Sequence, residues 1–160
     1  MILMLPKSLP ILLLAALAAW GQSKYSGPRP DKPDLPYLVH ADSLLATEAS
    51  EAKEQKGKKE QITYIVAGPA SGAKTPLASP IFLIQTQDLA ADKLQLYKLE
   101  VKNGQREISF TKKKQPAGFL VNATPLGADL YKIEVEQTLA PGEYVLTPEG
   151  SNRVFCFAVF

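Results

Sequence analysis

The sequence predicts an all-β protein, with residues 37–160 folded as one antiparallel β-sandwich. From Pro36 onward, apolar side chains recur mostly at every second position, which is the period of a half-buried strand. Turn residues such as Asn103-Gly104 separate the apolar runs, and no sustained helical stripe of apolar residues interrupts them. About nine short strands of this kind are best accommodated by two sheets packed on their apolar faces.

The first 21 residues are typical of an export signal. A short basic start containing Lys7 precedes an apolar run over 9–19, and small residues suited to cleavage follow. The run is too short to span a bilayer, which needs roughly 20 residues. We therefore expect cleavage between residues 19 and 23, and an exported mature protein, periplasmic or extracellular, without a transmembrane span.

Residues 22–36 are predicted to form an extended leader. Pro28, Pro30, Pro33 and Pro36 fix φ and remove backbone donors, which favours a polyproline-like conformation. Such a segment is typical of a spacer or of a disordered start to a domain.

Short strands are predicted after the leader at 37–39, 61–67 and 81–86, where β-branched and aromatic residues are bounded by turn residues. Residues 43–56 fit less well. We interpret 43–48 as a strand followed by a charged, solvated connection. The alternative is a short helix around 43–56, because Ser43 is a suitable cap and good helix formers follow it.

The strongest local pattern is a hairpin over 93–111, centred on Asn103-Gly104, the pair that a type I′ turn prefers. This turn places Val101 opposite Arg106. One face of the hairpin would then be buried and the other solvated, and Leu94 and Leu96 would be out of phase with the buried face, which predicts a bulge near 96–97. The residues expected on the buried face are Tyr97, Leu99, Val101, Ile108 and Phe110.

Further strands are predicted at 118–124, 130–136, 143–147 and 153–160. The last of these is apolar on both faces, which predicts a position inside a sheet.

Residues 139–144 (LAPGEY) resemble the entry to the penultimate strand of immunoglobulin-like and fibronectin-III-like sandwiches. In those domains a tyrosine at this corner bonds back to the backbone, so the resemblance implies that role for Tyr144. Over residues 36–160 the chain resembles exported bacterial proteins with an immunoglobulin-like domain. It departs from antibody-type domains because it has a single cysteine, Cys156, and its one tryptophan, Trp20, lies in the signal. The resemblance implies a fold and a compartment but no active site.

Composition argues against several classes of site. The chain carries 18 Lys+Arg against 16 Asp+Glu, mostly interspersed, whereas a nucleic-acid binder needs a basic face. The single cysteine rules out an intramolecular disulfide, and its apolar neighbours predict a buried thiol. His40, the only histidine, has no nearby His or Cys partner, so we expect no metal centre and no cofactor.

Two segments are candidate binding sites. The loop after residue 67 contains Ser71, Gly72, Lys74 and Thr75. It departs from a phosphate-binding loop because Ala73 stands where that motif needs glycine, so we interpret it as a loop that contacts a partner. The run of Lys112, Lys113 and Lys114 is a candidate contact for an anionic head group or wall polymer.

These patterns predict a non-catalytic interaction or structural module of the bacterial envelope, which binds a protein or surface polymer through loops or a sheet edge. Two alternatives stay open. A hydrolase would hold two carboxylates with opposed pKa shifts in a cleft. A carbohydrate-binding module would present a row of exposed aromatic side chains, drawn from Tyr25, Tyr37, Tyr64, Tyr97 and Tyr131.

Overall fold

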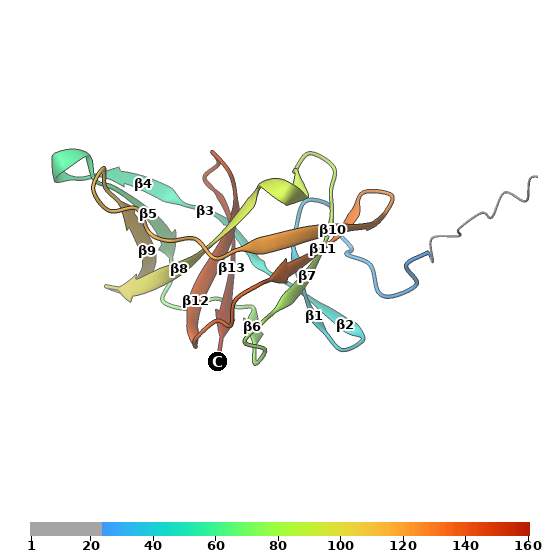
Figure 1. The fold of residues 1–160 in the computed structure, drawn as a ribbon. Helices are drawn as coiled ribbons and strands as arrows, with labels where there is room; N and C mark the ends of the chain where they lie inside the picture. The colour runs from blue at the N-terminus through green and yellow to red at the C-terminus, as the bar shows by residue number, and fades with distance from the viewer. Residues whose placement is uncertain (1–23) are drawn as a thin grey trace, which may run out of the picture.

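The computed structural model describes residues 24–160, so the predicted signal over 1–21 lies outside the described residues. The described chain is all-β and forms two antiparallel sheets, as predicted (Figure 1). Helical structure in this part of the chain is limited to two three-residue 3-10 turns, η1 (Lys58–Glu60) and η2 (Ala91–Lys93). Between residues 24 and 160, no helix has the length and apolar character that crossing a membrane requires.

The smaller sheet has five strands in the order β10-β11-β7-β1-β2. Their bounds are β1 (Tyr37–His40), β2 (Ser43–Ala46), β7 (Ile81–Gln85), β10 (Val121–Gly127) and β11 (Leu130–Val135). The larger sheet has eight strands, in the order β3-β13-β12-β8-β9-β5-β4, with β6 added in parallel to β13. Their bounds are β3 (Glu48–Glu51), β4 (Lys53–Lys56), β5 (Ile62–Ala67), β6 (Lys74–Thr75), β8 (Leu94–Lys102), β9 (Gln105–Phe110), β12 (Gly142–Pro148) and β13 (Arg153–Val159).

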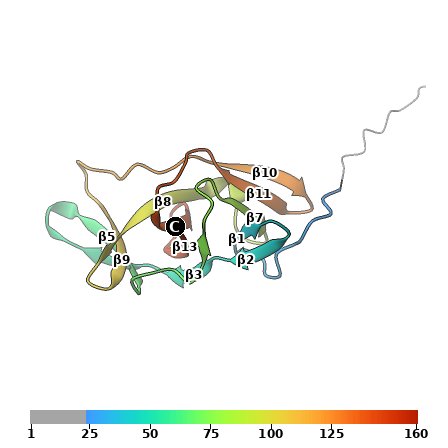
Figure 2. The ribbon, with the colours of Figure 1, turned by 90° about the horizontal axis from the view of Figure 1, so that it is seen from below.

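The larger sheet is strongly curled into a half-barrel, a feature that the sequence did not predict (Figures 1 and 2). β3 and β4 are separated only by Ala52, yet β3 pairs with β13 and β4 pairs with β5. Because β13 and β5 lie far apart in the strand order, the sheet has to bend to bring both beside one short segment. Ala52 itself is buried, and its N–H donates to the carbonyl oxygen of Asn152 at 2.8 Å.

The central strands β8, β12 and β13 are covered on both faces. On one face, Leu96, Tyr144, Phe155 and Phe157 pack against residues of the smaller sheet that include Phe82. On the other face, a second core lies inside the curl and is made of Ala52, Val66, Leu99, Val145, Val154 and Cys156. This explains why β13 is apolar on both faces. It lies inside the sheet as predicted, and the curl of its own sheet covers its second face.

The hairpin of β8 and β9 has the predicted register next to the turn, where Glu100 faces Glu107 and Val101 faces Arg106. Asn103 and Gly104 both have positive φ, at 51° and 71°, as a type I′ turn requires. The pairing ends at Glu100, whereas the predicted register, continued along the hairpin, would also pair Leu99 with Ile108 and Tyr97 with Phe110.

Two other expectations for this hairpin were wrong. Val101 is 52% exposed, because it lies beyond the inner core. The predicted bulge is also absent from the pairing of β8 with β12, which runs in one register from Leu94 to Leu99. Leu94 and Leu96 belong to the core between the sheets, whereas Leu99 belongs to the core inside the curl. One strand therefore serves two cores, and the apparent phase change needs no bulge.

No helix forms around 43–56, and the charged part of this segment is not a free connection. β2, β3 and β4 follow one another and pair with β1, β13 and β5 respectively. Every residue of β4 is exposed, so its side chains contribute little apolar burial. Backbone pairing at the sheet edges therefore outweighs the helix propensity of this segment.

The leader joins the domain at its last residues. Asp34 is buried, and its carboxylate accepts hydrogen bonds from the N–H groups of Gln87, Asp88 and Leu89 at 2.8–3.1 Å. Arg153 donates to the carbonyl oxygen of Asp34 at 3.0 Å. Burial raises the pKa of the Asp34 carboxyl, but the three N–H donors and the Arg153 charge outweigh it, so the pKa lies below its usual 3.8. Asp34 thus joins the end of the leader to the loop after β7 of the smaller sheet and to β13 of the larger sheet.

We predict that Asp34→Asn lowers the free energy of unfolding at pH 7 by about 1–2 kcal/mol, because the charge-assisted bonds become neutral ones. The carboxyl has a lower pKa in the folded chain than in the unfolded chain. Its contribution is therefore present above the unfolded value of 3.8 and is lost as the pH falls through the folded value. Urea unfolding at pH 7 and at pH 3 should show a smaller acid-induced loss in the variant than in the parent. An equal acid-induced loss of stability in the variant and the parent would contradict a stabilising role for the Asp34 carboxylate.

Candidate functional site

The concave face of the half-barrel encloses a pocket of about 680 Å³. Its walls are alternate residues of five strands, because alternate side chains of a strand point to the same face of a sheet. Segments far apart in the sequence therefore meet here. The wall residues include Ile62, Tyr64 and Val66 of β5, Tyr97 and Leu99 of β8, Ile108 and Phe110 of β9, Val145 of β12 and Val154 of β13.

Three aromatic rings form the upper wall of this pocket. Phe110 meets Tyr64 edge-on at a centroid distance of 5.8 Å and Tyr97 edge-on at 5.7 Å. All three side chains are half-buried, so part of each ring faces the hollow. Edge-to-face pairs of this kind hold the rings in place and leave an apolar surface for a ligand.

The mouth of the pocket is polar. Gln95, Thr147, Ser151 and Asn152 line it, together with Glu54, which is exposed. Among the lining residues, all in the described part of the chain, Glu54 is the only carboxylate. Polar groups are therefore concentrated at one end, whereas the depth of the pocket is apolar.

The floor of the pocket is tightly packed. Leu99, Val145 and Cys156 are buried beneath the open part of the hollow. Burial raises the pKa of the Cys156 thiol to about 12, the charges of Glu48 and Glu143 add to this, and Arg106 opposes it. The thiol is thus protonated at neutral pH and acts as an apolar filler rather than as a nucleophile.

A buried ion network closes the end of the half-barrel below this floor. Arg106, two residues before Ile108 on β9, is only 1% exposed. Its Nη2 donates to Glu48 Oε1 at 2.6 Å, and its Nη1 lies 3.9 Å from Glu143 Oε2. The guanidinium also donates to the carbonyl oxygens of Ala67 and Gly68, at 2.6 and 3.0 Å.

Ser71 completes the network. Its hydroxyl accepts from Arg106 Nη1 at 2.8 Å and donates to Glu143 Oε2 at 2.5 Å. The N–H groups of Ser71 and Gly72 donate to the carboxylates of Glu143 and Glu48, respectively. A buried guanidinium is tolerated when it is paired with carboxylates and hydrogen-bonded, and here each of the three guanidinium nitrogens of Arg106 donates at least one hydrogen bond.

Two residues of the predicted binding loop, Ser71 and Thr75, are therefore part of the packed structure. Ser71 and Thr75 are buried, and Thr75 belongs to the short strand β6 beside β13. Gly72 and Lys74 are exposed. The loop lies across the closed end of the half-barrel, and partner binding by it stays a prediction.

Lys112, Lys113 and Lys114 are exposed in the loop after β9, and Lys112 forms an ion pair with Glu60 of η1.

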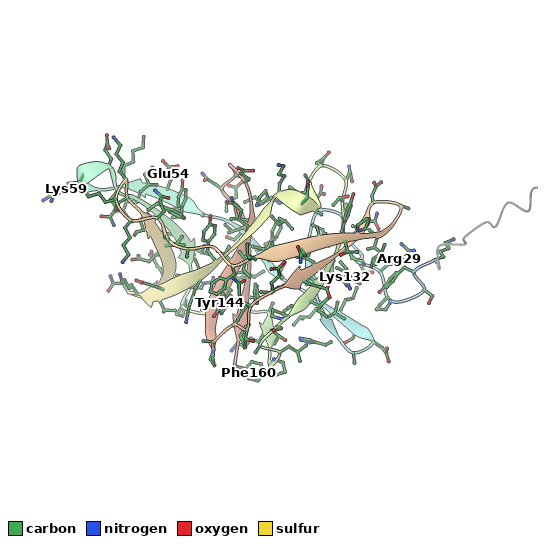
Figure 3. The ribbon with its side chains drawn as sticks, in the orientation of Figure 1. Arg29, Glu54, Lys59, Lys132, Tyr144 and Phe160 are labelled. Carbon is green, nitrogen blue, oxygen red and sulfur yellow. The ribbon has the colours of Figure 1, made fainter. Side chains whose placement is uncertain are left out.

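Tyr144 lies on the other face of the larger sheet, near the centre of the molecule in Figure 3. Its hydroxyl donates to the carbonyl oxygen of Ala140 at 2.6 Å. This is the backbone bond that the resemblance implies for a tyrosine at this corner.

The five tyrosines considered for carbohydrate binding do not form one row. Tyr64 and Tyr97 share the pocket, whereas Tyr37 is buried in β1 and Tyr131 belongs to β11 of the smaller sheet. Tyr25 lies in the leader, and its hydroxyl donates to the carbonyl oxygen of Pro28. Only two of the five are therefore brought together.

The structure brings together one pair of acids at the closed end, Glu48 and Glu143, and both are held by Arg106. Other acids pair with lysines on the surface, Glu100 and Glu107 with Lys102 and Glu134 with Lys132. Residues 24–160 contain no cluster of three or more His, Cys, Asp and Glu side chains placed to hold a metal ion.

Sequence reasoning missed Arg106 and the pocket itself. Arg106 occupies the same alternating row as Ile108 and Phe110, so the pattern contained a signal that its side chain points inward. The apolar walls were recognised as core positions. Only the curl of the sheet turns them into the lining of a hollow.

We predict that Arg106→Met lowers the free energy of unfolding by about 3–5 kcal/mol, because two carboxylates would lose the charge that compensates their burial. The matched control is Arg29→Met, which removes an exposed arginine from the leader and should change stability by about 0.5 kcal/mol or less. Urea denaturation followed by circular dichroism measures both. A cost for Arg106→Met as small as that of the control would show that the network contributes no net stability.

Comparison with known proteins provides no relative for this chain. No protein-family model, curated protein or solved structure matches it. Function is therefore inferred from the chemistry of the pocket.

Proposed function

We propose that this protein is a non-catalytic binding protein that takes an apolar group of its ligand into the half-barrel pocket. The observation that carries the proposal is the lining, which is aliphatic and aromatic in its depth and polar only at its mouth. The volume of about 680 Å³ lies in the range of small-molecule sites, and hollows within curled sheets are a common location for such sites.

The distribution of ionisable groups supports binding over catalysis. A hydrolase that uses paired carboxylates needs two acids facing one cleft. In this pocket Glu54 at the mouth is the one carboxylate among the lining residues. Glu48 and Glu143 lie below the floor, where Arg106 and Ser71 occupy their oxygens.

Carbohydrate binding is the second candidate, because Tyr64 and Tyr97 both line the pocket beside the amides of Gln95 and Asn152. Against it, the rings of Tyr64 and Tyr97 pack edge-on against Phe110, which favours a rounded apolar wall over one flat platform for a sugar ring.

We further propose that the protein is exported to the bacterial envelope, where it meets an envelope protein, a surface polymer or a ligand of that compartment. The apolar segment over 9–19 and the small residues after it support export.

An immunoglobulin-like relationship of the sheets is also part of the proposal. The bond from Tyr144 to Ala140 supports it, although the strong curl of the larger sheet sets this chain apart from a simple sandwich.

Binding of N-phenyl-1-naphthylamine, a neutral apolar dye that fluoresces in apolar surroundings, tests the pocket. We expect the protein to bind the dye, and we expect Ile108→Trp to weaken binding at least about tenfold, because the indole would fill the hollow. Leu120→Trp is the matched control, since Leu120 is 61% exposed and outside the pocket.

Both tryptophan variants should retain the β-rich circular dichroism spectrum of the parent. Failure of the parent to bind the dye, or equal binding by Ile108→Trp, would refute the apolar pocket as the site. Displacement of the dye by simple sugars at comparable concentration would favour the carbohydrate alternative instead.

Export is tested by expressing the full chain in a bacterial host. We expect the protein in the periplasm or medium, with a new N-terminus between residues 19 and 23 determined by mass spectrometry. Recovery of only the uncleaved chain from the cytosol would contradict export.

A further inference from the structure

A second hollow adjoins the mouth of the pocket. It has a volume of about 560 Å³ and shares Ile62, Phe110 and Gln115 with the pocket. Its outer wall carries two lysines, Lys56 at the end of β4 and Lys112 in the loop after β9, and one carboxylate, Glu60 of η1. A molecule seated against Phe110 would therefore have an apolar wall on one side and ammonium groups on the other.

Positive charge is concentrated on this rim. Residues 54–60 and 112–114 carry six lysines and two glutamates, whereas the whole chain has 18 Lys+Arg against 16 Asp+Glu. The ion pair between Lys112 and Glu60 brings the two segments together at the end of the half-barrel where Figure 3 labels Glu54 and Lys59. The lysines of both segments are exposed to solvent, and Lys112 already pairs with Glu60, so an anionic head group would share the Lys112 charge with that carboxylate.

We propose that the ligand of the pocket is a free single-chain anionic amphiphile of the fatty-acid type, an inference that rests on the proposed function. Its acyl chain would lie along Tyr64, Tyr97 and Phe110, and its anionic head group would be bound by Lys56 and Lys112. The acyl chain would then be buried against apolar side chains, and the head group would stay hydrated at the mouth of the pocket. Lysine side chains suit this role, because their flexible stems carry a strongly hydrated charge.

The lysines at the rim and the apolar depth of the pocket together favour an anionic amphiphile over other classes of ligand. A neutral apolar ligand would make no use of the lysine rim. A nucleic acid would need basic surface that continues beyond the rim, and the rest of the chain is close to charge balance. A bilayer surface would satisfy the lysines but would not fill a hollow that reaches down to Leu99 and Val145.

Displacement of the dye by laurate and by dodecanol tests the proposal, because the two differ in head-group charge and share a chain of the same length. We expect laurate to displace the dye at a concentration at least about tenfold lower than dodecanol, which corresponds to one good charge-assisted contact. In the double variant Lys56→Gln with Lys112→Gln, this preference should fall to about threefold or less, and 0.5 M NaCl should reduce it in the parent. Dye binding itself and displacement by dodecanol should not change.

The matched control is Lys32→Gln with Lys93→Gln, which removes two exposed lysines outside both hollows and should keep the full preference for laurate. Equal displacement by laurate and dodecanol, with the dye still bound, would overturn the anionic ligand and leave the apolar pocket standing. Absence of dye binding would overturn the proposed function itself. Sedimentation with phosphatidylglycerol vesicles without displacement by laurate would assign the rim to a membrane surface and overturn the proposal.

Discussion

The pairing of residues 48–56 with two distant strands is the constraint on which the rest of the structure depends. β3 bonds to β13 and β4 bonds to β5, with only Ala52 between them. A flat sheet cannot satisfy both sets of backbone bonds, since β13 and β5 are separated by three other strands in the sheet order. The curl follows from this, and the curl makes one face of the sheet concave.

The two ends of the concave face are chemically opposite. At one end a buried arginine, two carboxylates and a serine hydroxyl satisfy one another and seal the half-barrel. At the other end polar side chains and lysines surround an open mouth. The sealed end is closed by hydrogen bonds and ion pairs, and the floor is packed, so the hollow opens toward the polar end. The change from apolar depth to lysine-bearing rim is the basis of the ligand that we propose.

Features that depend on neighbouring residues were predictable from the sequence. The Asn103-Gly104 turn and the register next to it are as predicted, because the turn type alone sets which residues face each other. The bond from Tyr144 to Ala140 spans only four residues. Val101 and Arg106 show where this reasoning stops. They share an alternating row with buried residues, yet Val101 is exposed and Arg106 is buried, and the loop that crosses the end of the half-barrel bonds to Arg106 through Gly68 and Ser71.

The sequence by itself determined that the described chain is all-β and forms two antiparallel sheets, because this follows from the alternation of apolar side chains along the strands. It also determined that the last strand is interior, because that strand is apolar on both faces. The tertiary structure alone decided that the charged residues after 48 also pair as strands, that the larger sheet curls and that its inner face leaves a hollow. The physical reason is that each of these depends on backbone groups and side chains supplied by strands far away in the sequence. A local pattern records which residues are apolar, but it does not record what covers them.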